Sequence, residues 1–87
     1  MKVLWSNFAS LTLKEIFLYY KENAGIKIAR KIKSDIISST KRLKSHPKLG
    51  QVESTLEKLN AGHRYLVEGN YKIIYGIVAE GILITDV

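Results

Sequence analysis

Three side chains in the second half of the chain could take part in chemistry: His63, Arg64 and Lys72. A histidine titrates near neutrality, so His63 could exchange a proton with a substrate. Arg64 and Lys72 could stabilise a negative charge such as that of a phosphate. The structural alternatives are a histidine that begins a strand, a surface lysine, and an arginine that pairs with a neighbouring carboxylate such as Glu68. No spacing joins the three residues into a recognisable catalytic set.

The sequence offers no usual ligand set for a metal. There is no cysteine, and His46 and His63 are not spaced with carboxylates in a way that would hold an ion. We therefore expect no cofactor and no metal site. The longest apolar stretch, Ile73 to Val78, is interrupted by Gly76 and is far shorter than a membrane span. The first residues turn polar too early for a signal peptide, so we expect a soluble cytoplasmic protein without a membrane partner.

Positive charge is concentrated in the first half of this basic chain, whose net charge is +6. Residues 1–50 carry eleven Lys or Arg and three Asp or Glu, whereas residues 51–87 carry three and five. This asymmetry indicates a polyanionic or acidic partner, such as RNA, DNA or an acidic protein; a merely solvated surface is the alternative. The candidate residues for binding a polyanion or a target protein are Lys27, Arg30, Lys31, Lys33, Lys41, Arg42, Lys44, Arg64 and Lys72.

Two helices must position most of these basic residues. Thr12 and Glu15 have the spacing of a capping box, which predicts that the first helix starts at Thr12. Gly25 can end this helix in the left-handed conformation. The second helix follows at once and must stop before Pro47, so the pair is predicted to form an antiparallel hairpin. The helical residues expected to face the core are Ile16, Phe17, Ala29, Ile32, Ile36 and Leu43.

Short segments with alternating side chains predict the strands. Residues 2–6 form the first strand, and residues 63–67, 71–78 and 82–87 form the later ones. Residues 51–60 fit a helical turn or an extended link. The 87 residues therefore predict one domain of the α+β class, in the order β-α-α-β-β-β. Its helical hairpin packs on a small, mostly antiparallel sheet, because this arrangement buries both apolar faces.

Three local motifs occur in the same order as in a known family. The link His46-Pro47-Lys48-Leu49-Gly50 follows the basic helix, Arg64 to Tyr75 contains a Tyr-Lys-x-x-Tyr hairpin, and Ile82 to Val87 forms the last strand. With the element order, these motifs resemble the RelE/ParE toxin superfamily of type II toxin–antitoxin and plasmid-stabilisation systems, over nearly the whole chain. The resemblance implies a growth-inhibiting toxin that a cognate antitoxin neutralises.

Within this superfamily the chain is closer to the ParE-like branch. Lys72 stands where many RNA-cleaving members have arginine, and the sequence stops at Val87, where RelE-type members continue with residues needed for cleavage. Resemblance to ParE implies a toxin that binds DNA gyrase and needs no catalytic residues. One alternative is a RelE-like endonuclease that cleaves mRNA on the ribosome, with His63, Arg64 and Lys72 as catalytic residues. A second is a non-toxic member that still binds its antitoxin.

Overall fold

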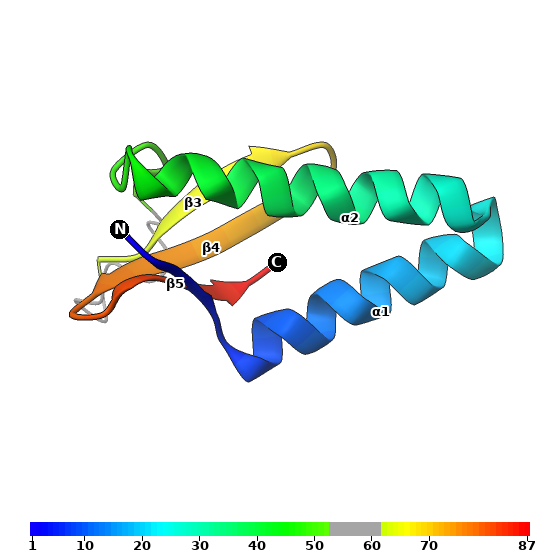
Figure 1. Ribbon diagram of the computed structural model, residues 1–87, viewed down its shortest axis with the longest axis horizontal. Coiled ribbons are helices and arrows are strands. Elements are labelled where there is room, and N and C mark those ends of the chain that lie inside the picture. The colour runs from blue at the N-terminus through cyan, green and yellow to red at the C-terminus, as the bar shows by residue number, and fades with distance from the viewer. Residues whose placement is uncertain (53–61) are drawn as a thin grey trace.

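The computed structural model describes residues 1–52 and 62–87. In this part of the chain, two helices lie against one face of a five-stranded sheet (Figure 1). The predicted order and α+β class are confirmed, with a two-residue strand in addition; most of the ambiguous segment 51–60 lies outside the described residues. The elements are β1 (Val3–Trp5), α1 (Asn7–Ala24), α2 (Ile26–Lys41), the 3-10 turn η1 (Arg42–Lys44), β2 (Gln51–Val52), β3 (Arg64–Glu68), β4 (Tyr71–Val78) and β5 (Gly81–Asp86).

Helix α1 is capped by Ser6, so the predicted start at Thr12 is wrong. The Ser6 hydroxyl accepts a hydrogen bond from the Ala9 amide at 3.0 Å. The Thr12 hydroxyl lies within the helix instead and donates to the Phe8 carbonyl at 3.0 Å. Serine and threonine are both good caps. Ser6 takes the role because its amide also donates to the Ile84 carbonyl at 2.9 Å, which fixes the point where the chain leaves the sheet.

Gly25 joins the two helices in a hairpin, as predicted. Its φ of 96° lies in the left-handed region that favours glycine, because a Cβ in this conformation would clash with the adjoining backbone. Helix α2 ends at Lys41 and η1 carries the chain on to a point before Pro47. Helix α1 packs beside β5 and α2 beside β3, so the hairpin spans the sheet. The tip of the hairpin extends beyond the sheet, and the helices diverge from that tip (Figure 1).

The sheet has the strand order β1-β5-β4-β3-β2. Strand β1 runs parallel to β5 and every other neighbouring pair is antiparallel, which confirms the mostly antiparallel sheet. Its helix-covered face and the hairpin together form the core. Burying each large aliphatic side chain there contributes about 1.5–3 kcal/mol. The buried core residues are Ala9, Leu13, Ile36, Leu43, Leu66, Ile73, Tyr75, Ile82 and Ile84.

The helical residues predicted to face the core divide into two groups. Ala29, Ile36 and Leu43 are buried, as predicted. Ile16, Phe17 and Ile32 are only half-buried. Phe17 stays partly open because it borders the space in which the two helices diverge.

Candidate functional site: an apolar groove with a basic rim

A groove lies between the diverging helices and reaches the end of β1. It consists of two adjoining hollows of about 360 and 400 Å³, which share Phe17, Lys33 and Ile37. We call it the hairpin groove. Its lining residues are Trp5, Ser10, Leu13, Lys14, Phe17, Arg30, Lys33, Ser34, Ile37, Ser38 and Lys41.

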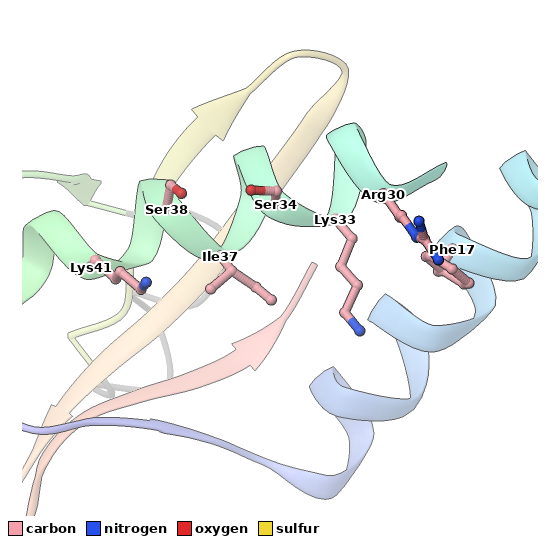
Figure 2. Close-up of a pocket in the computed structure, with 7 residues that line it drawn as sticks. All are labelled: Phe17, Arg30, Lys33, Ser34, Ile37, Ser38 and Lys41. Carbon is pink, nitrogen blue, oxygen red and sulfur yellow. The ribbon is translucent and has the colours of Figure 1, made fainter. Parts of the chain in front are cut away.

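The hairpin groove combines an apolar floor with a basic rim. The floor consists of Trp5, Leu13, Phe17 and Ile37, and the rim of Lys14, Arg30, Lys33 and Lys41. None of the described residues that line it is acidic. Arg30, Lys33, Ile37 and Lys41 are spaced three or four residues apart, which places them on one side of α2. Figure 2 shows Lys33 and Ile37 projecting from α2 toward the space beside α1.

Lys33 links the two walls of the groove. Its ammonium nitrogen lies 5.4 Å from the centroid of the Phe17 ring, within the range of a cation–π interaction. At an exposed site such a contact contributes about 0.5–1 kcal/mol. The contact holds a positive charge directly beside the apolar floor. A ligand that covers Phe17 would therefore meet this charge as well.

Of the basic residues that the sequence proposed, only some belong to the groove. Arg30, Lys33 and Lys41 line it, whereas Lys27, Lys31, Arg42 and Lys44 do not. The Lys31 ammonium instead binds Asp35 at 2.9 Å, and this hydrogen bond raises the pKa of Lys31. Arg42 donates to the Ser39 hydroxyl at 3.2 Å. Lys14 was not among the residues predicted from the sequence, although its spacing from Ser10 and Phe17 places all three on one side of α1.

Arg64 holds the link that follows the helices. Its guanidinium donates to the carbonyl of Gly50 at 2.8 Å and to that of Lys48 at 3.5 Å. Neither reading of the sequence, a contact with a target or an ion pair with Glu68, describes this arrangement. Within the described residues, the visible partners of Arg64 are backbone carbonyls of its own chain, and these bonds hold the link in place.

The three candidate catalytic residues do not converge on one side of the sheet. Arg64 pairs with Tyr75, whose side chain is buried beneath the helices. Lys72 pairs with Val67, which is an odd number of residues from Arg64 along β3. The Lys72 ammonium lies 4.3 Å from the centroid of the Tyr65 ring. Because side chains alternate along a strand, Arg64 and Lys72 emerge on opposite faces.

His63 lies on the same face as Lys72 but far along the strands. Its ring is 3.7 Å from the point where a Cβ on Gly76 would lie. Gly76 and Lys72 are four residues apart on β4, which corresponds to roughly 13 Å of extended strand. The Nδ1 atom of His63 is buried and makes no hydrogen bond with any part of the chain that the structure describes. Lys72 therefore lies well away from His63, and Arg64, although next to His63 in the sequence, emerges on the other face of the sheet.

Residues 1–52 and 62–87 also bear on metal and membrane sites. This part of the chain contains no group of three histidine, cysteine or acidic side chains that could hold an ion. Its helices are too short or too polar to cross a membrane. Among the described residues, the hairpin groove combines apolar side chains with four cations, Lys14, Arg30, Lys33 and Lys41.

The fold and the groove define a small α+β domain that carries an apolar groove with a basic rim. Residues 3–87 match the family described as "ParE toxin of type II toxin-antitoxin system, parDE". The chain belongs to this family, and it is a ParE-family toxin of a ParDE toxin–antitoxin system. No curated protein sequence matches it.

A solved structure supports the fold independently. It is titled "Chromosomal ParDE TA system from P. aeruginosa" and has a TM-score of 0.80 and 20% sequence identity to this chain. The match covers 99% of this chain and 91% of the other. At this identity the likeness shows the fold alone, so partners and target must be argued from the residues of this chain.

Proposed function

We propose that a cognate antitoxin neutralises this toxin by laying an acidic amphipathic helix in the hairpin groove. The observation that carries the proposal is the combination of an apolar floor with a basic rim. The apolar face of such a helix would cover Phe17 and Ile37, while its carboxylates would meet Lys33 and the other rim cations. A chain this small has a thin core, so covering the floor would also stabilise it.

The test compares two lysines of helix α2. Lys33→Glu reverses a charge on the groove rim, and Lys27→Glu makes the same change outside the groove. The ligand is the protein encoded beside this gene, and calorimetry measures its Kd. We expect Lys33→Glu to weaken binding at least about tenfold, or ~1.4 kcal/mol, and Lys27→Glu to change it little. Equal effects of the two substitutions would exclude the hairpin groove as the binding site.

We propose that the cellular target is DNA gyrase and that the toxin inhibits it by binding, without catalysing a reaction. This proposal is supported by membership of the ParE family and by the emergence of Arg64 and Lys72 on opposite faces of the sheet. The competing RelE-like function requires those residues to act on one phosphate of mRNA on the ribosome. A non-toxic member of the family would bind its antitoxin but leave growth unaffected.

Induction in bacteria separates the three functions. A gyrase-binding toxin should trigger the DNA-damage response before translation stops, and the purified chain should inhibit supercoiling by gyrase. If translation arrest comes first and supercoiling is unaffected, the endonuclease function replaces our proposal. Normal growth with the folded chain present would identify a non-toxic member.

A further inference from the structure

Helix α1 has a second apolar face, which points away from both the core and the hairpin groove. Phe8, Leu11, Leu18 and Tyr19 are exposed by 63, 55, 42 and 60%. The three- and four-residue spacing of a face that contacts another helix connects positions 8, 11, 15, 18 and 22. Positions 15 and 22 are glutamates. We call this face the outer stripe. It consists of Phe8, Leu11, Glu15, Leu18, Tyr19 and Glu22.

The core does not explain this face of the helix. Ala9 and Leu13 form the buried side of α1, and Phe17 faces the hairpin groove. Single exposed apolar residues are common on protein surfaces, but four of them on one helix face indicate an interaction site.

The charges on the outer stripe restrict its partner. Glu15 and Glu22 are both exposed and lie along the line of the seam. Two outer stripes packed against each other would bring glutamates together, and this repulsion disfavours a symmetric pair of α1 helices. The stripe therefore suits a surface that is apolar and basic. The same chain carries such a surface, because the hairpin groove has an apolar floor and a rim with Lys14, Lys33 and Lys41.

We propose that the outer stripe of one copy docks in the hairpin groove of a second copy. The contact joins two different surfaces head to tail, so a pair keeps one free groove on the first copy and one free stripe on the second. The proposal rests on the groove being the docking site proposed above. It adds a form of regulation, because a second toxin and the antitoxin helix would compete for the same groove. The contact would cover apolar surface in toxin molecules that have no antitoxin.

Two charge reversals test the pairing directly. Glu15→Lys damages the outer stripe and leaves the groove intact, whereas Lys33→Glu damages the groove and leaves the stripe intact. Glu80→Lys is the control, because it changes the net charge as Glu15→Lys does but lies in the exposed turn before β5. Sedimentation measures the mass of each protein. The measurement is made at physiological salt, because screening then limits repulsion between the basic chains to about 8 Å.

The wild type and Glu80→Lys should associate further as concentration rises, and each of the other two variants alone should remain monomeric. An equimolar mixture of Glu15→Lys and Lys33→Glu should associate again, since the stripe of each variant then meets the groove of the other with the opposite charge. Circular dichroism and melting curves establish that every variant is folded. A wild type that stays monomeric at all concentrations, or a mixture that does not associate, overturns the proposal.

Antitoxin binding separates this proposal from the earlier one. Glu15→Lys should bind the protein encoded beside this gene at least as tightly as the wild type does, because the outer stripe does not line the groove and no second copy then competes for it. If the wild type self-associates as described but Lys33→Glu retains antitoxin binding, the antitoxin proposal fails and the self-association stands. If Lys33→Glu loses antitoxin binding while the mixture stays monomeric, the antitoxin proposal stands and the self-association proposal fails.

Discussion

The Tyr75 hydroxyl accepts a hydrogen bond from the backbone amide of Gly50 at 2.9 Å and donates one to the Pro47 carbonyl at 2.8 Å. Two separate sequence motifs, the Pro-x-x-Gly link and the Tyr-Lys-x-x-Tyr hairpin, thus meet in the core. Gly50 is required at this point, because a Cβ there would lie 2.8 Å from the Tyr75 hydroxyl and 2.6 Å from the Tyr65 carbonyl.

Tyr75→Phe should lower the free energy of unfolding by about 1–3 kcal/mol, because it leaves the buried Gly50 amide without a partner. Urea denaturation measures the loss. Tyr65→Phe is the matched control, since the Tyr65 hydroxyl donates to the exposed Gln51 side chain at 2.8 Å. Equal losses in the two variants would show that the link does not depend on Tyr75.

Ile36→Ala should destabilise the chain by about 2–5 kcal/mol, as truncation of a buried isoleucine does. Because the helical pattern also places Ile32 toward the core, the sequence alone predicts a loss of the same size for Ile32→Ala. In the structure Ile36 is only 1% exposed, whereas Ile32 is half-buried, so Ile32→Ala should cost less. Thermal and chemical denaturation of the two variants give the comparison. A larger loss for Ile32→Ala would contradict the placement of α2 on the sheet.

Tyr71 should make stability depend on alkaline pH. Burial, followed by the hydrogen bond that Tyr71 donates to the Tyr20 hydroxyl at 3.2 Å, raises its pKa from 10.0 to about 12. The folded chain therefore holds this proton more tightly than the unfolded chain does. The resulting stability is fully present below pH 10 and is lost as the pH rises toward about 12. Denaturation of wild type and Tyr71→Phe across this range should show a smaller loss in the variant, and ultraviolet titration reports the ionisation itself.

The purified chain should not cleave RNA, either alone or on ribosomes. In-line attack by a 2′-hydroxyl requires an acid or base at each end and a fixed cation at the phosphate. Arg64 binds carbonyls of its own chain, and Lys72 emerges on the opposite face of the sheet. Toeprinting on translating ribosomes is the assay. New cuts in the ribosomal A site that disappear with Lys72→Ala or Arg64→Ala would establish the endonuclease function.

The sequence by itself determined the features that depend on local spacing. Gly25 and Pro47 bounded the helices, alternating side chains predicted the strand of residues 71–78, and motif order indicated the family. The start of α1 was missed because Ser6 and Thr12 are chemically similar caps. The choice between them depends on the hydrogen bond from the Ser6 amide to Ile84.

Only the tertiary structure decided which charged residues share a surface. The groove brings together Trp5 of β1, Phe17 of α1 and Lys33 of α2, residues that no local pattern connects. In the sheet, the pairing register places Arg64 under the helices and Lys72 on the other face. The physical reason is that a periodic pattern fixes how side chains alternate within one element. Which face becomes buried, and what lies across from it, depends on packing between elements distant in the sequence.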